Sequence, residues 1–294
     1  MRLFIFRGSI VAIIAALSIC MYKMIDIHIS YSNIEKNDNA MAEYAPPATI
    51  PSIKPDRTDV SESPQPEQKE TVIPEPGQSK PPESESESES ESEPEPQNQE
   101  TVPGTNQSVL NAQKDLNEEI TAWLRVPNTK IDYPVVHGED NSFYLNHNVR
   151  KESSNAGSIF VDSRNNEGFI DFNTIIYGHN MINGSMFSDL IKFYDSAFFL
   201  ESPAPELFLP DVTYTLEVFA FLRIKQDDRI IYNTITNANF PAYIEYVEAN
   251  AIHYRDIQLE SYDNIVTLST CTNDAADERM VVLARLKDAG ALEF

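Results

Sequence analysis

The feature that most constrains this chain is a pair of short apolar runs near its carboxyl end. The first covers residues 264–271 and the second residues 280–286, and both are rich in β-branched and other apolar residues. Eight mostly polar residues without a proline separate them, which is the pattern of two strands joined by a loop. If the strands pair, Cys271 lies at the end of one strand beside Arg279 at the start of the next. A thiol next to a guanidinium indicates a nucleophile with a group that stabilises negative charge.

The rest of the carboxyl-terminal part also has mainly the pattern of strands. Helical spacing of apolar residues predicts an amphipathic helix over 110–124, ended by Pro127, and further helices over 186–193 and 240–255. Many strands with few helices indicate a mainly β domain, a closed barrel or a sandwich, decorated by helices. The predicted strands cover residues 131–136, 157–162, 172–177, 214–224, 230–236, 265–271 and 280–286.

The amino-terminal end has the pattern of a membrane segment. Arg2 and Arg7 precede a run without charge over residues 8–22. This predicts a signal anchor over residues 1–31 with its N-terminus inside the cell, because positive charge stays on the cytoplasmic side. A cleaved secretory signal is the alternative.

A biased segment follows. Residues 32–107 are poor in large apolar residues and rich in Pro, Ser, Glu and Gln, with a Ser-Glu alternation over 83–93. Such a composition cannot bury enough surface to fold, so we predict a disordered linker. A spacer is the expected role, and binding of a basic partner is the alternative. The folded domain is then expected at residues 108–294.

Charge and cysteine usage exclude several functions. The net charge of −24 makes nucleic acid an unfavourable partner. The two cysteines, Cys20 and Cys271, fall in the apolar run and the folded domain, so we expect no disulfide between them. An unpaired cysteine in an exported domain is either reactive or a buried, inert apolar residue. One cysteine with scattered histidines has no ligand spacing for zinc, so no metal site is predicted.

A cysteine, a histidine and an arginine together can carry out acyl transfer. The thiolate attacks a carbonyl, the imidazole protonates the departing amine, and the guanidinium stabilises the oxyanion. His179 follows an apolar run at its carboxyl end, next to Gly178, where a scaffold presents a side chain to a cleft. A structural role for His179 is the alternative, because composition alone does not choose among the five histidines, which are His28, His137, His147, His179 and His253.

Four segments resemble one enzyme family. TLSTC at 267–271, with Arg279 eight residues later, resembles the active-site strand pair of the sortases, the cysteine transpeptidases of Gram-positive cell surfaces. The resemblance covers about residues 109–287 in collinear order, and the helix predicted at 240–255 falls where class B members carry an added helix. The other three segments resemble class B sortases: NTIIYGHNMINGSMFSDLIKFYD at 173–195, WLRVPNTKIDYPVV at 123–136 and AGSIFVDSRN at 156–165.

This resemblance implies a fold and a set of residue roles. The fold is an eight-stranded sortase-type β barrel with an N-terminal helix and an added helix before the cysteine strand. Cys271 would be the nucleophile, His179 the acid and base, and Arg279 the anchor of the oxyanion. Thr272 departs from those class B members that have an acidic residue after the cysteine. The residues implied for the substrate groove are Asn141, Leu145, Tyr177, Ser269 and Thr270.

The resemblance also implies an activity and its partners. The enzyme would cleave the C-terminal sorting signal of a surface protein after its Thr through a thioester. It would transfer the acyl group to an amine of peptidoglycan or of its lipid-linked precursor, without a metal or other cofactor. It would be a single-pass protein of the cell membrane with an extracellular catalytic domain. The alternatives are pilin polymerisation, a cysteine endopeptidase that uses water as acceptor, and a non-catalytic surface module.

Overall fold

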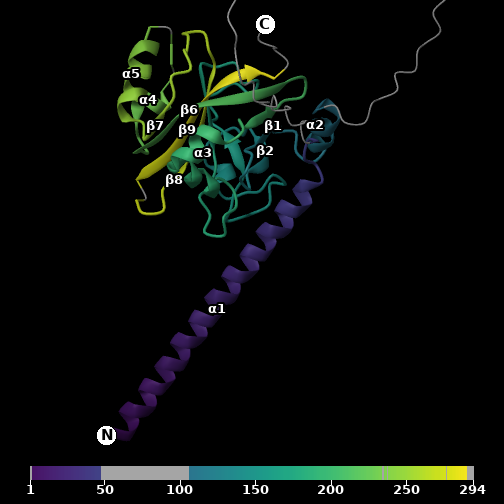
Figure 1. Cartoon of the computed structure of the whole chain (residues 1–294). Coiled ribbons are helices and arrows are strands. Elements are labelled where there is room, and N and C mark those ends of the chain that lie inside the picture. Colours follow the sequence, from purple (N-terminus) through teal and green to yellow (C-terminus); the bar gives the residue numbers. More distant parts are fainter. Residues whose placement is uncertain (1, 48–105, 234, 237, 276, 290–294) are drawn as a thin grey trace, which may run out of the picture. The chain divides into compact units, whose positions relative to one another are not determined.

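The structure is a computed structural model that describes residues 2–47, 106–233, 235–236, 238–275 and 277–289 (Figure 1). It contains a long helix, α1 (Arg2–Ala42), and a domain built around one curved sheet. Most of the predicted linker lies outside the described residues. The helix α1 continues past residue 31, so the first residues assigned to that linker are helical.

The domain is a closed β barrel within the described part of the chain. Its eight strands run in the order β5-β1-β2-β3-β4-β8-β9-β6, and pairing of β5 with β6 closes the ring. A ninth strand of two residues, β7 (His253–Tyr254), pairs with β6 outside the ring. The predicted eight-stranded barrel is therefore confirmed. The ring strands are β1 (Ile120–Arg125), β2 (Asp132–Val136), β3 (Ile159–Val161), β4 (Asn173–Tyr177), β5 (Glu206–Phe208), β6 (Thr213–Lys225), β8 (Ile265–Cys271) and β9 (Glu278–Asp288).

Successive side chains along β8 and β9 contribute alternately to two apolar clusters, one on each face of the sheet. Val266 and Leu268 of β8 belong to the main core cluster, together with Val282 of β9. Their neighbours Ile265 and Val281 belong to a second cluster with the helices. Successive side chains on a strand point to opposite faces, so one face of this sheet lines the main core while the other is covered from outside.

The cover on that outer face comes from the connection between β6 and β7. It contains α4 (Arg229–Tyr232) and α5 (Phe240–Asn250), which lie beside β6 and β7 in Figure 1. The Asp228 carboxylate caps α4 by accepting hydrogen bonds from the backbone N–H groups of Ile230 and Ile231, at 2.9 and 3.0 Å. The other helices of the domain are α2 (Asn106–Lys114), η1 (Phe143–Leu145), η2 (Ser188–Tyr194) and α3 (Ser196–Glu201).

Two sequence-based predictions of secondary structure are wrong. The helix predicted over 110–124 is α2 followed by strand β1, whose first five residues are all buried. Apolar residues covered on both faces of a strand also match helical spacing, which explains the error. The strand predicted over 230–236 begins as the short helix α4. The predicted helix over 240–255 ends at Asn250, and the one over 186–193 is the 3₁₀ helix η2.

A helix that crosses a lipid bilayer needs about 20 consecutive, mainly apolar residues. None of the helices in the described ranges combines the length with the apolar character that such a crossing requires. The anchor predicted over residues 1–31 stays a prediction.

Candidate active site

The ends of three neighbouring strands meet at one edge of the barrel. β4 runs parallel to β8, with Tyr177 opposite Ser269, and the N–H of Gly178 donates to the Ser269 carbonyl at 3.2 Å. β8 runs antiparallel to β9, and its last residue, Cys271, is the register partner of Arg279. His179 follows β4 directly. The register of the sheet thus brings the three predicted catalytic residues to one place.

A cavity of about 280 Å³ opens at this edge. Cys271 is a free, partly exposed cysteine at its wall, so it is not fully buried as an inert apolar cysteine would be. All eight predicted site residues line the cavity, in a set that comprises Asn141, Leu145, Phe160, Tyr177, Gly178, His179, Gln226, Tyr232, Ser269, Thr270, Cys271 and Arg279.

The His179 ring is oriented by a backbone carbonyl. Its Nε2 lies 2.7 Å from the carbonyl oxygen of Leu145 in η1. A carbonyl oxygen only accepts, so Nε2 donates this hydrogen bond, and in the neutral ring Nδ1 holds the lone pair. One ring nitrogen is therefore fixed by the scaffold, which leaves Nδ1 as the nitrogen that can exchange a proton.

The guanidinium of Arg279 is held from two sides. Its Nη1 donates to the carbonyl of Glu278 at 3.0 Å, and its Nη2 donates to Oε1 of Gln226 at 2.9 Å. Gln226 follows β6 directly and belongs to the connection that covers the site. A guanidinium held in a fixed direction is suited to stabilise charge that develops on a substrate carbonyl.

Asn180 connects the histidine segment to the cysteine strand. Its side-chain Nδ2 donates to the carbonyl of Cys271 at 2.9 Å and to Oδ1 of Asn273 at 2.7 Å. The residue next to the imidazole therefore holds the backbone at the thiol and the start of the loop that leads to Arg279.

A buried carboxylate supports one wall of the cavity. Asp162 accepts from the hydroxyl of Tyr177 at 2.9 Å and from Nε and Nη2 of Arg164 at 2.9 and 2.8 Å. Burial alone would raise the pKa of Asp162, but the hydrogen bonds from Arg164 and Tyr177 outweigh it and lower the pKa to about 2. Burial and the adjacent Asp162 raise the pKa of Tyr177, so this phenol stays neutral.

Tyr232 also lines the cavity, with its ring centroid 6.4 Å from that of Tyr177, and it was not found from the sequence. Its hydroxyl lies 2.8 Å from Oγ of Ser269, and burial raises the pKa of Tyr232 to about 12. A buried relay fixes its backbone: Thr267 donates to Asn173 at 2.6 Å, and Asn173 donates to the carbonyl of Ile231 at 2.9 Å. Gln226, Phe160 and Asn180 were missed as well. No local pattern marks these residues, because the fold brings them to the site.

A metal site needs several ligating side chains that converge on one point. Across the described ranges, no group of three or more His, Cys, Asp or Glu side chains is placed to hold a metal ion.

A closed barrel with these three side chains at one cavity corresponds to a known protein family. Residues 124–287, more than half of the chain, match the family model of the sortase domain. The chain therefore belongs to the sortase family, whose members are cysteine transpeptidases, and the relatives below place it in class B.

Relatives of this chain are named sortase B. Sortase B of Listeria monocytogenes is 37% identical over 188 residues, covering 63% of this chain and 76% of the relative. The structure of Clostridium perfringens sortase B is 37% identical, with a TM-score of 0.57, covering 61% of this chain and all of that one. A Staphylococcus aureus sortase B–substrate complex is 26% identical, with a TM-score of 0.58, covering 63% of this chain and 87% of that one.

Proposed function

We propose that this class B sortase cleaves a C-terminal sorting signal after its Thr and transfers the surface protein to an amine of peptidoglycan or of its lipid-linked precursor. The observation that carries the proposal is the single cavity lined by Cys271, His179 and Arg279. The partly exposed thiol supports a role as nucleophile, because an attacking sulfur must reach its substrate.

The first half of the reaction forms a thioester. The Cys271 thiolate attacks the carbonyl carbon of the Thr, and the Arg279 guanidinium stabilises the negative oxygen that results. As the carbonyl reforms, the C–N bond breaks, and the His179 imidazolium gives its proton to the departing amine. The sorting signal leaves with its new amino terminus, and the acyl group stays on sulfur.

The second half reverses these steps with a new amine. The acceptor amine attacks the thioester carbon, His179 takes the amine's proton, and the C–S bond breaks to return the thiolate. Arg279 stabilises the second oxyanion as it did the first. Water can attack the same thioester, so transfer requires that the acceptor amine reach it before water does.

The substrate groove is proposed to follow the cavity wall. The side chains of Tyr177 and Ser269 are neighbours on paired strands, and Leu145 lies in η1 beside the His179 ring. A substrate complex is known for the Staphylococcus aureus relative. We place the sorting peptide along Asn141, Leu145, Tyr177, Ser269 and Thr270, with its scissile carbonyl between Cys271 and Arg279.

The cellular location is proposed on the sequence of the amino-terminal end. The uncharged run at 8–22 behind Arg2 and Arg7 supports a single-pass anchor with the catalytic domain outside the cell. The protein should then fractionate with membranes and keep its amino terminus. A mature amino terminus near residue 25, found by mass spectrometry, would contradict this location.

The activity is tested with a panel of fluorogenic sorting peptides. The full chain should cleave one of them, and the Cys271→Ala variant should not. If Cys271→Ala cleaves as well as the parent, the assignment of the nucleophile fails. An added acceptor amine separates the two enzymatic outcomes, since a transpeptidase yields the amide product and an endopeptidase yields the free acid, which differ in mass.

A further inference from the structure

The last part of α1 is packed against the barrel, whereas the part before it is not. Residues 16–29 are exposed on every side. From there one face becomes buried: Ile34 is 4% exposed and Met41 is 6% exposed, with Tyr31 and Tyr44 partly buried. Tyr31, Ile34 and Met41 lie on a single helical face, and Tyr44 follows the end of the helix. We call residues 30–47 the docking segment.

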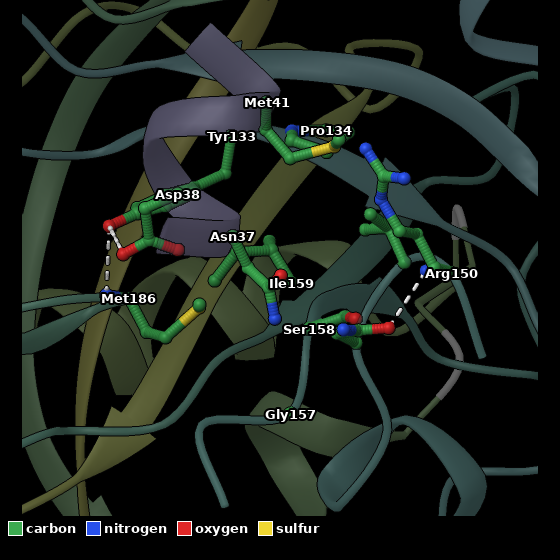
Figure 2. A pocket seen from close by; sticks show the side chains of 12 residues that line it. Asn37, Asp38, Met41, Tyr133, Pro134, Arg150, Gly157, Ser158, Ile159 and Met186 are labelled. Atoms are coloured by element: carbon green, nitrogen blue, oxygen red, sulfur yellow. Dashed lines mark hydrogen bonds between the residues drawn. The ribbon is translucent and has the colours of Figure 1, made fainter. Parts of the chain in front are cut away.

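Two apolar contacts hold the docking segment. Ile34 belongs to the main core cluster of the barrel, and Met41 belongs to a cluster with Leu110 of α2 and Trp123 of β1. Figure 2 shows Asn37, Asp38 and Met41 on the helix, facing residues of the barrel that include Tyr133 and Ile159. A pocket of about 30 Å³ lies between the two surfaces, which is about the space of one water molecule.

Hydrogen bonds occur along the whole length of this contact. Nδ2 of Asn155 donates to Oγ of Ser30 at 3.1 Å at its start. At its end, Gln113 of α2 donates to the carbonyl of Tyr44, and Nη2 of Arg125 donates to the carbonyl of Pro46 at 2.7 Å. The described chain stops at Pro47, directly after these bonds.

These contacts bear on what the acidic residues 48–105 do. The described chain stops after Pro47 and resumes at Asn106, where α2 begins. Gln113, two turns into α2, is bonded to Tyr44, so described residues on either side of residues 48–105 contact each other. While these contacts hold, they and not the length of residues 48–105 set the separation between α1 and the barrel.

We propose that the docking segment fixes the catalytic barrel directly to α1, so that the length of residues 48–105 does not set the distance between helix and barrel. The position of the active site relative to α1 is then set by a packed contact. The proposal is independent of the activity proposed above.

The test is a distance measurement between two spin labels in the full chain, purified in detergent. The native Cys20 is exposed on α1 and takes one label, in a Cys271→Ala background. Tyr262→Cys, at a residue that is 76% exposed between β7 and β8, takes the other. Removing residues 60–90 should leave the distance between the two labels unchanged, because docking sets that distance.

A double variant of the docking segment removes the docking. Ile34→Asp together with Met41→Asp places two charges in the contact, and the distance distribution should broaden and then depend on whether residues 60–90 are present. Asn39→Asp together with Ala42→Asp is the matched control, because it adds two charges to exposed positions of the same helix. Far-UV circular dichroism verifies that α1 stays helical in all variants.

Two results would overturn the proposal. One is a distance between the two labels that shortens when residues 60–90 are removed from the protein with an unaltered docking segment, which is the behaviour of a spacer. The other is a distribution for Ile34→Asp/Met41→Asp that matches that of the Asn39→Asp/Ala42→Asp control.

Discussion

Cys271 and Arg279 are register partners across the β8–β9 ladder, and both line the same cavity. Side chains opposite each other on paired strands lie on one face of the sheet, so the ladder itself sets the spacing of thiol and guanidinium. The loop between them is only the connection between the two strands. We therefore expect the reactivity of the site to depend on the groups that orient these two residues.

The guanidinium of Arg279 is expected to act through its direction as well as its charge. Arg279→Ala should lower kcat/KM for peptide cleavage by about 100- to 1,000-fold, the usual effect of removing an oxyanion donor. Arg279→Lys keeps the charge but loses the planar fork, so it should recover only a small part of that loss. Steady-state cleavage of a fluorogenic peptide measures both. Equal activity of the lysine variant and the parent would show that charge alone is sufficient.

Gln226 is expected to orient that guanidinium without neutralising it. Gln226→Ala removes one hydrogen bond of about 1 kcal/mol, so kcat should fall roughly fivefold. Gln226→Glu places a carboxylate against the same Nη2, which competes with the oxyanion and should lower kcat further than alanine does. Comparing kcat for the two variants at equal thermal stability checks this. A glutamate variant faster than the alanine variant would contradict it.

Asn180 is expected to position the thiol relative to the imidazole. Asn180→Ala frees the Cys271 carbonyl and the start of the following loop, and kcat should fall about tenfold or more, because small misplacements of reacting groups are costly. KM should change much less. Asn250→Ala is the control, since Asn250 also donates to a carbonyl, at 2.8 Å, but in α5 away from the cavity. An unchanged kcat for Asn180→Ala would exclude the positioning role.

Docking of α1 is expected to weaken as pH rises. Burial raises the pKa of Asp38 from 3.8 to about 6; the hydrogen bond from Tyr133 opposes this shift, and the nearby Glu35 adds to it. The docked state thus favours the protonated carboxyl, so the contribution of Asp38 to the docking free energy is fully present below about pH 4 and is lost as pH rises through 6. Other charged groups near the contact include Asp189, which acts on Tyr133, Arg150, and Arg125, which donates to the Pro46 carbonyl.

The spin-label pair described above measures this pH dependence. The docked fraction should decrease between pH 5 and pH 8 in the parent chain. It should stay constant in Asp38→Asn, which has no carboxyl to ionise. A docked fraction in the parent that increases over the same range would contradict the expected direction of the pH dependence.

The strands of the site were predictable because their signal is local. β8 has the same bounds as the predicted strand, 265–271, since an uninterrupted run of β-branched and apolar residues ends there at a turn. β9 extends two residues beyond the prediction at each end, because Arg279 and Lys287 still pair with β6 although they are polar. Chain order and register then bring Cys271, Arg279 and His179 together.

The errors occur where tertiary contacts decide the structure. Leu124 of β1 belongs to the main core cluster, while Trp123 packs in another cluster with α2, so the strand has no polar face that would distinguish it from a helix. Residues 230–232 have high strand propensity, but the Asp228 cap and packing under α5 make them helical. β5, with three residues, is too short for a recognisable pattern.

The site residues that could not be identified from the sequence have the same explanation. Tyr232 and Gln226 reach the cavity because the connection between β6 and β7 folds back over the outer face of the sheet, a relationship between residues far apart in the chain. Contacts of this kind leave no periodic signal in the sequence. The resemblance to class B sortases indicated the added helix but not which side chains accompany it.

The central claim is that Cys271 forms a covalent thioester with the substrate. Mass spectrometry of the full chain, mixed with a panel of sorting peptides and quenched in acid, tests it most directly. The account predicts an adduct with the mass of the peptide up to its Thr, on the fragment that contains Cys271 and absent from Cys271→Ala. Cleavage of a peptide by the parent without any such adduct, or an adduct on another residue, would contradict it.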